Sequence, residues 1–164
     1  MMNKLTSRMI LVSFTLFLSF SLSSPSFPTI HELLRSKGLP AGLLPQEVDS
    51  YKLHQDGRLE VFLEAPCFTE YETNVYFDSI VRANLSYGSL VGVEGFKQQE
   101  LFLWLSVIDI VVENPNSGVI IFDIGVATKQ LSLSLFEDPP KCRPQQDQGV
   151  LKKMMRRVRG FEAL

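Results

Sequence analysis

The sequence predicts an all-β protein with one short N-terminal helix: a compact β pseudo-barrel or sandwich of about seven strands, followed by an amphipathic C-terminal tail. Short segments rich in β-branched and aromatic residues recur between turn signals, and several alternate apolar with polar residues. Beyond the first 23 residues the most apolar run is Glu100–Val112, and the turn that follows it at Asn114–Gly118 favours a strand over a buried helix. We expect a central strand here, covered on both faces, which implies a sandwich or a closed barrel.

The predicted helix covers Ile30–Lys37, where apolar residues recur at helical spacing and Gly38 supplies the stop. It begins at Thr29 or Pro28. The following segment, Leu39–Pro45, is bracketed by prolines and too hydrophobic for a linker. We expect its leucines to plug one end of the core.

The remaining strands are read from alternation and turn residues. Asp56-Gly57 is a strong hairpin signal between two alternating runs, and Asp78-Ser79 is interpreted as another turn. Gly88, Gly92 and Gly95 indicate bulges or tight corners. The predicted strands are Tyr51–Gln55, Arg58–Ala65, Tyr71–Phe77, Ile80–Tyr87, Val119–Ile124 and Thr128–Phe136.

The first 23 residues have the three regions of a secretory signal peptide: Lys4 and Arg8, an apolar run over Met9–Phe20, and a small-residue site with cleavage before Ser24. An uncleaved N-terminal anchor is the alternative. Residues 24–142 are then a single β-rich domain and residues 143–164 a basic tail, disordered or helical. A secreted protein would be extracellular, in the apoplast, and Asn84-Leu85-Ser86 would be a glycosylation sequon at Asn84.

Two cysteines, Cys67 and Cys142, can form one disulfide in an oxidising compartment. The other interpretation, one buried thiol and one exposed thiol, remains open.

Charge is distributed unevenly along the chain. Residues 25–140 hold seven bases and sixteen acids, a net charge of −9, whereas residues 141–164 hold seven bases and two acids, a net charge of +5. The acidic body argues against nucleic-acid binding, because it offers no basic surface to displace counterions.

The tail is predicted to form a basic amphipathic helix, typical of segments that bind anionic membranes or a partner's groove, unless it is a disordered solubilising tail. Its apolar stripe is Val150, Leu151, Met154, Met155, Val158 and Phe161, and the candidate membrane- or partner-binding residues are Lys152, Lys153, Arg156, Arg157 and Arg159.

No catalytic, cofactor or metal motif stands out. His31 and His54 are expected to be solvated, and the sequence has no nucleophile elbow, phosphate loop or metal-ligand spacing. We therefore expect a protein that is not an enzyme and carries no cofactor and no metal. An esterase-like hydrolase using Ser86, Ser106 or Cys67 is a remote alternative.

Large apolar side chains are abundant in the predicted strands. A small barrel either fills its interior with such side chains or encloses one apolar ligand. The candidate ligand-binding residues, in the interior of the sheet or at an open end of it, are Leu39, Leu43, Leu44, Phe102 and Trp104.

The chain also resembles a known family, the plant domain of unknown function 538 family, over about Ile30 to Cys142. The matching segments are Leu39-Pro40-x-Gly42-Leu43-Leu44-Pro45, Asp56-Gly57, Cys67, Tyr87-Gly88, Gly92-Val93, Leu101-Phe102-Leu103-Trp104-Leu105, Phe122-x-x-Gly125 and Phe136-Glu137-x-Pro139-Pro140-x-Cys142. The resemblance implies a plant protein, often secreted, with a helix followed by a β pseudo-barrel and no established catalytic residues. Members are loosely compared with lipid-binding domains of bactericidal/permeability-increasing proteins, a comparison at fold level alone.

The leading functional hypothesis is a secreted, non-enzymatic module that binds an apolar small molecule or a lipid membrane surface. The alternative is a protein-interaction module in growth or stress signalling that uses its basic tail, with a calmodulin-like partner if the protein is cytosolic.

Overall fold

The computed structural model describes residues 27–143 and Lys153. Its N-terminal helix, α2, spans Ile30–Ser36 and confirms the predicted helix to within a residue. A capping box starts it: the Thr29 hydroxyl accepts from the Glu32 backbone N–H, and the Glu32 carboxylate accepts from the Thr29 N–H at 2.7 Å. Ile30 and Leu34 are its buried residues, so one stripe of the helix packs on the sheet.

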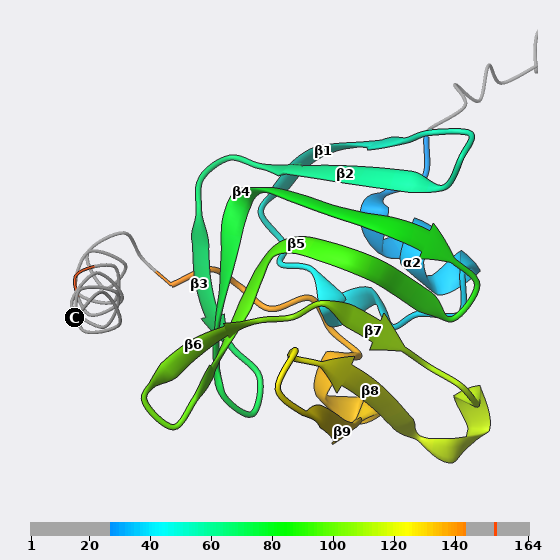
Figure 1. The fold of residues 1–164 in the computed structure, drawn as a ribbon. Coiled ribbons are helices and arrows are strands. Elements are labelled where there is room, and N and C mark those ends of the chain that lie inside the picture. Colours follow the sequence, from blue (N-terminus) through cyan, green and yellow to red (C-terminus); the bar gives the residue numbers. More distant parts are fainter. Residues whose placement is uncertain (1–26, 144–152, 154–164) are drawn as a thin grey trace, which may run out of the picture.

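The prediction of an all-β fold with one short helix is confirmed, but the strands number nine among the described residues. They form one antiparallel sheet in the order β1-β2-β4-β5-β7-β8-β9, with β3 beside β4 and β6 beside β5 (Figure 1). This sheet is not closed into a barrel. The strands are β1 Val48–Leu53, β2 Arg58–Leu63, β3 Cys67–Glu70, β4 Asn74–Ser86, β5 Ser89–Glu100, β6 Leu103–Ser106, β7 Asp109–Val111, β8 Val119–Asp123 and β9 Thr128–Ser132.

The predicted hairpin at Asp56-Gly57 is present between β1 and β2. Gly57 has a φ of 88°, a conformation that glycine adopts without a Cβ clash, and the His54 N–H donates to the Arg58 carbonyl at 2.8 Å. The turn that we predicted at Asp78-Ser79 is wrong, because both residues lie inside β4. There the register between β4 and β5 shifts, with Phe77 opposite Phe96 but Arg82 opposite Glu94, so the polar pair marks a bulge.

The predicted central strand Glu100–Val112 is also wrong. Glu100 ends β5, Leu101 and Phe102 form a tight turn, and the rest of the run is divided between β6 and β7. The long central strands are instead β4 and β5, which pair with each other. On its other edge β4 pairs with β2 and β3, and β5 pairs with β6 and β7. High apolar content misled the prediction, because part of this run is exposed at a hairpin end.

Three short 3-10 helices are found in the part of the chain that the structure describes: η2 Ala41–Leu43, η3 Pro115–Ser117 and η4 Leu133–Phe136. The predicted strand Thr128–Phe136 is therefore correct up to Ser132, after which η4 turns the chain inward and buries Phe136. The proline-bracketed segment carries η2, and its leucines do enter the core as expected.

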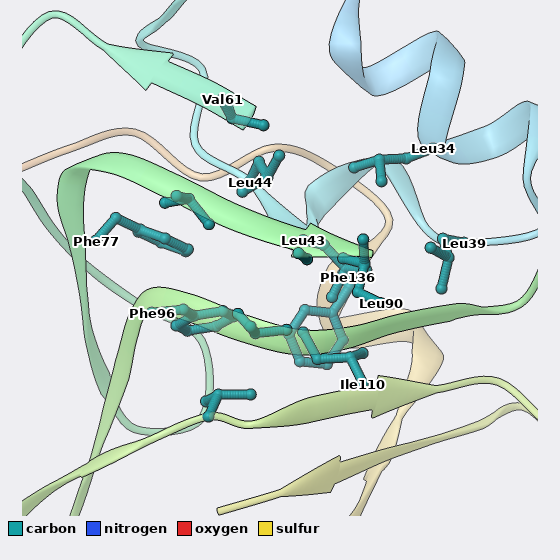
Figure 2. Packing of buried hydrophobic residues seen from close by; sticks show 14 of the residues in the cluster. Leu34, Leu39, Leu43, Leu44, Val61, Phe77, Leu90, Phe96, Ile110 and Phe136 are labelled. Atoms are coloured by element: carbon teal, nitrogen blue, oxygen red, sulfur yellow. The ribbon is translucent and has the colours of Figure 1, made fainter. Parts of the chain in front are cut away.

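The main core lies between the concave sheet, α2, η2 and η4. Figure 2 shows Leu34, Leu39, Leu43 and Leu44 pointing towards aromatic rings contributed by the sheet and η4. Those rings make a continuous series, with centroid distances of 4.4 Å for Phe77–Phe96, 6.0 Å for Phe96–Phe122 and 5.3 Å for Phe122–Phe136.

A disulfide joins Cys67 on β3 to Cys142, as one of the two sequence interpretations held. It lies in an extended segment, Pro139–Arg143, that we call the C-terminal strap. Strap atoms bond two distant parts of the chain: the Gln46 N–H donates to the Pro140 carbonyl at 2.9 Å, and the Thr69 hydroxyl donates to the Lys141 carbonyl at 2.8 Å. The strap thus fixes the start of β1 to β3.

Candidate functional site

An exposed apolar hairpin tip is the most unusual surface feature of the described residues. We define the hairpin tip as Leu101, Phe102 and Leu103, whose residues are 89%, 82% and 45% exposed. Glu100 and Leu103 pair across the turn, so the hairpin loop consists of two residues. Consecutive large apolar side chains held in water at the end of a hairpin are typical of a binding surface rather than of a folding requirement.

The backbone of the tip is strained as well. Leu101 has a φ of 53°, and among the described residues it is the one non-glycine residue with a positive φ. The left-handed conformation costs an L-residue about 1–2 kcal/mol, a cost that glycine avoids. Glycine would be more stable than leucine at this position, so the stability of the fold does not explain why Leu101 is present.

Trp104 anchors the tip to the sheet. Its ring packs edge-on against Phe68 at a centroid distance of 5.9 Å, and Phe68 contacts Tyr76 at 4.7 Å. We call Phe68, Tyr76 and Trp104 the outer aromatic face, because they form a cluster separate from the main core. Lys97 places its ammonium 6.0 Å from the Tyr76 ring centroid at the border of this face.

The carboxylate next to the tip is neutralised. Lys129 on β9 forms an ion pair with Glu100, and the Gln98 amide donates to the same carboxylate oxygen at 2.9 Å. Both partners of the ion pair are about three-quarters buried, so the negative charge beside the tip is shielded. An apolar or anionic surface can therefore approach the tip without facing a bare carboxylate.

The five predicted ligand-binding residues do not gather around one cavity. Leu39, Leu43 and Leu44 lie in the main core and are at most 3% exposed, whereas Phe102 is in the tip and Trp104 is on the outer aromatic face. The small internal cavity beside Tyr71, Phe96 and Phe122 measures about 10 Å³, the size of one water molecule at most. The leucines serve packing, and no apolar ligand fits this cavity.

A polar groove of about 260 Å³ crosses the solvent face of β2, β4 and β5 and was missed by the sequence analysis. Arg82 Nε donates to Glu60 Oε1 at 3.1 Å, and His54 Nε2 lies 3.6 Å from Glu60 Oε2. The bond from Arg82, followed by that from His54, lowers the pKa of Glu60. The groove can bind a small polar group through paired charges, but its lining residues include no serine, threonine or cysteine to act as a nucleophile.

The two histidines are less solvated than expected. His54 lies in the polar groove beside Glu60, and His31 is half-buried with its Nδ1 at 2.9 Å from the Ala41 carbonyl oxygen. His31 thereby connects the first turn of α2 to η2. Among the described residues, the structure shows no contact between either imidazole and a candidate nucleophile. The thiol of Cys67 is part of the disulfide.

Asn84, the predicted glycosylation residue, is exposed on β4 and lines the same groove. Ser86, which completes the sequon, is also exposed and contacts the Ser89 hydroxyl at 3.3 Å. Both residues point to solvent, so the folded sheet leaves room for a glycan at Asn84.

A second surface groove, of about 480 Å³, lies between Phe27–His31 and Gln46–Tyr51.

Of the five predicted tail residues, Lys152, Arg156, Arg157 and Arg159 lie outside the described residues. Lys153 is described, in a helical turn with an exposed side chain. The predicted signal peptide also lies outside the described part. Within residues 27–143 and at Lys153, no helix is both long and apolar enough to cross a membrane.

These features define a small, mostly β protein. In its described part, a capped helix packs on an open antiparallel sheet, a disulfide joins β3 to the C-terminal strap, and the β5–β6 hairpin exposes an apolar tip. The chain belongs to the family described as "Protein of unknown function, DUF538", whose model matches residues 30–137. This confirms the resemblance seen in the sequence. A comparison with curated proteins finds no match.

Proposed function

We propose that this protein is a secreted, non-enzymatic module that binds lipid membrane surfaces through its hairpin tip. The observation that carries the proposal is the exposure of three consecutive large apolar side chains, Leu101 to Leu103, on a strained turn. The sequence suggested either an apolar small molecule or a membrane surface as the ligand. We favour the membrane surface, because the cavity beside Tyr71, Phe96 and Phe122 has a volume of about 10 Å³ and is too small to enclose a ligand.

The geometry suits shallow insertion into a bilayer. Trp104 follows the tip directly in the chain, and amphipathic indoles favour the headgroup region of a membrane. Burying a leucine or phenylalanine side chain contributes about 1.5–3 kcal/mol, so three of them support weak, reversible binding at best. The tip therefore needs a second contact to hold the protein on a membrane, as single lipid anchors do.

The basic tail is the proposed second contact. Lys152, Lys153, Arg156, Arg157 and Arg159 would each contribute about 1 kcal/mol near an anionic leaflet. They would also offset the repulsion between such a membrane and the acidic body of the protein, whose residues 25–140 have a net charge of −9.

The test measures vesicle binding of the full mature chain. Vesicles of phosphatidylcholine, with and without phosphatidylserine, are mixed with the protein, and binding is followed by co-sedimentation and by the emission of Trp104, the chain's single tryptophan. We expect a blue shift with vesicles that the variant Leu101→Ser/Phe102→Ser loses. Val126→Ser is the matched control, because Val126 is 78% exposed in the turn between β8 and β9.

Two outcomes contradict the proposal. The wild-type protein could stay in solution with both vesicle types, or the tip variant could bind as well as the wild type. Specific capture of a protein by the tail without lipid binding would instead support the alternative, a protein-interaction module.

Secretion is tested separately through Asn84. In plant cells the secreted protein should lose mass on treatment with an N-glycosidase, and Asn84→Gln should abolish that change. A protein that retains its leader and carries no glycan would contradict the secreted location.

A further inference from the structure

The outer aromatic face lies on the side of the sheet away from the main core. Here β3, β4, β5 and β6 form a four-stranded ribbon, in which Phe68 pairs with Tyr76 and Tyr76 with Lys97. The neighbours of these residues along each strand, such as Cys67 and Phe77, point to the opposite face and belong to the main core. The ribbon therefore carries aromatic side chains on both faces, and on the outer face they lie beside Lys97.

The aromatic residues on this outer face are buried. Phe68 is 2% exposed and Tyr76 is 7% exposed, although they lie across the ribbon from the core. Within the described part of the chain, the apolar side chain packed against this pair is that of Trp104, itself half-exposed. Trp104 is therefore the part of this face that remains open to a further apolar surface.

The C-terminal strap ends at this face. The Arg143 N–H donates to the Phe68 carbonyl at 2.7 Å, and the Arg143 guanidinium pairs with Glu70 on the same strand. The described part of the domain therefore ends at the edge of β3, beside Phe68. Twenty-one residues follow in the sequence, through Leu164.

These residues have the length and pattern to cover the outer aromatic face. Val150 lies seven positions after Arg143, and seven extended Cα-to-Cα steps reach about 23 Å. The ribbon of four strands is about 14 Å wide. A helix over residues 150–161 would be about 18 Å long and would present one apolar stripe.

We propose that residues 150–161 form a helix whose apolar stripe packs on Phe68, Tyr76 and Trp104. The stripe consists of Val150, Leu151, Met154, Met155, Val158 and Phe161. Methionines suit an aromatic surface, since thioether sulfur interacts favourably with ring edges. Lys153 lies off the stripe, and its exposed side chain in a helical turn agrees with this arrangement.

Charge supports the same occupant. The tail residues 141–164 have a net charge of +5 and the body has a net charge of −9, so docking brings opposite charges together. A helix of twelve residues is marginal in water without a surface to pack on, and the outer aromatic face supplies that surface.

Docking on the sheet and binding to a membrane would exclude each other, because the same apolar stripe cannot contact both. In solution the docked helix would bury its apolar stripe and cover the outer aromatic face. An anionic membrane would compete with the sheet for the apolar stripe, and in this respect the inference rests on the proposed function. Docking of the helix in the absence of lipid does not depend on that function.

The test uses the full mature chain without lipid. Acrylamide quenching of Trp104 measures how well the outer aromatic face is covered, and hydrogen–deuterium exchange measures the protection of amides 150–161. The stripe variant is Leu151→Gln/Met154→Gln, and the control is Lys152→Arg/Lys153→Arg, which changes two residues off the stripe and keeps their charge. Glutamine and arginine have helix propensities close to those of leucine, methionine and lysine, so both variants keep the tendency to form a helix.

We expect the stripe variant to show a red-shifted Trp104 emission, a severalfold rise in quenching and loss of amide protection, whereas the control keeps all three values. Amides 150–161 that exchange like an unstructured peptide in the wild type would overturn the proposal. So would protection that requires vesicles, since the membrane and not the sheet would then be the occupant. These readouts need no membrane binding, so failure of docking and failure of the proposed function are distinguishable.

Discussion

The hydroxyl of Tyr71 donates a 2.6 Å hydrogen bond to the carbonyl oxygen of Gly42. This bond joins the turn between β3 and β4 to η2, two parts of the chain that the sheet does not connect. The Tyr71 ring also packs on Phe136 at a centroid distance of 4.6 Å. Burial raises the pKa of the Tyr71 phenol, because the phenolate would lose its solvation.

Replacing Tyr71 with phenylalanine keeps the ring and removes the hydroxyl. The Gly42 carbonyl then loses its bond from Tyr71, and we expect the free energy of unfolding to fall by about 1–3 kcal/mol in urea denaturation at neutral pH. A denaturation midpoint equal to that of the wild type would contradict a structural role for this bond.

The raised pKa of Tyr71 also gives a pH dependence. The folded state keeps the phenol protonated, so its contribution to stability is complete below the unfolded pKa of about 10 and is lost as the pH rises towards the folded pKa. Between pH 9 and pH 11 the wild type should therefore lose more stability than Tyr71→Phe, which lacks the group. Equal losses in the two proteins would exclude this linkage.

Two glycines on β5 provide a matched test of backbone crowding. Gly92 and Gly95 have φ values of 64° and 82°, but a Cβ at Gly92 would meet nothing within 4 Å, whereas one at Gly95 would lie 2.5 Å from the Ile80 carbonyl oxygen. We expect Gly92→Ala to cost about 1–2 kcal/mol from the conformation alone. Gly95→Ala should cost a further 1–3 kcal/mol or so, because the clash adds to the conformational term.

Chemical denaturation of the two variants measures this difference. It also tests the bulge in β4, since Ile80 lies where the register between β4 and β5 shifts. Equal costs at the two positions would mean that β4 moves away freely and that the bulge does not depend on Gly95.

Removing the disulfide should destabilise the protein strongly. Cys67 and Cys142 are 75 residues apart in sequence, and closing a loop of that length stabilises by about 4 kcal/mol in the chain-entropy model. Cys67→Ala/Cys142→Ala should lower the free energy of unfolding by about that amount. Wild-type protein unfolded in the presence of a reductant is the control and should match the variant.

Glu60 and Asp56 allow a reciprocal test in the polar groove and its adjoining hairpin. Arg82 lowers the pKa of Glu60, and Arg58 lowers that of Asp56 through backbone and side-chain hydrogen bonds. In carboxyl NMR titrations, Arg82→Gln should raise the pKa of Glu60 and leave that of Asp56 in place, and Arg58→Gln should do the reverse.

The sign of the linked stability follows from these lowered values. Each carboxylate stabilises the folded state above its unfolded pKa, about 4.3 for Glu60, and the contribution disappears as the pH falls through the lower folded pKa. A pKa of Glu60 that does not respond to Arg82→Gln would contradict the role of that guanidinium.

Local signals in the sequence predicted the parts of the fold that local chemistry decides. The helix start depends on Thr29 and Glu32, which are three residues apart, and the first hairpin depends on Asp56-Gly57. In both cases the residues that specify the element are also the residues that satisfy its backbone groups. The disulfide was one of two interpretations that the sequence left open, because two cysteines in a chain with a predicted leader can pair but their spacing does not decide it.

The errors arose where distant strands decide the outcome. Asp78-Ser79 looks like a turn, but Gly95 on the neighbouring strand lets β4 continue with a bulge. The residue type gives no warning that Leu101 adopts a left-handed conformation, so the apolar run around it was read as one strand. Hydrophobicity cannot distinguish a buried strand from an exposed tip without the pairing partners.

The candidate site shows the same division. Phe102 and Trp104 were predicted from the sequence as part of a ligand site in the sheet interior or at an open end, whereas the structure places Phe102 in the hairpin tip and Trp104 on the outer aromatic face. The polar groove was missed because Glu60 and Arg82 meet only when β2 pairs with β4 and skips β3. Knowledge of that crossover would have been needed to find it.

The C-terminal strap sets the order in which the chain can finish folding during its synthesis. Pro140 and Cys142 bond to Gln46 and Glu47, more than ninety residues earlier, and Lys141 and Arg143 bond to β3. Hairpins such as β1–β2 can form as soon as they emerge, since their contacts are local. The start of β1 and the outer edge of β3 stay open until residues 139–143 have been made, and during that interval the growing protein exposes strand edges that a chaperone can recognise.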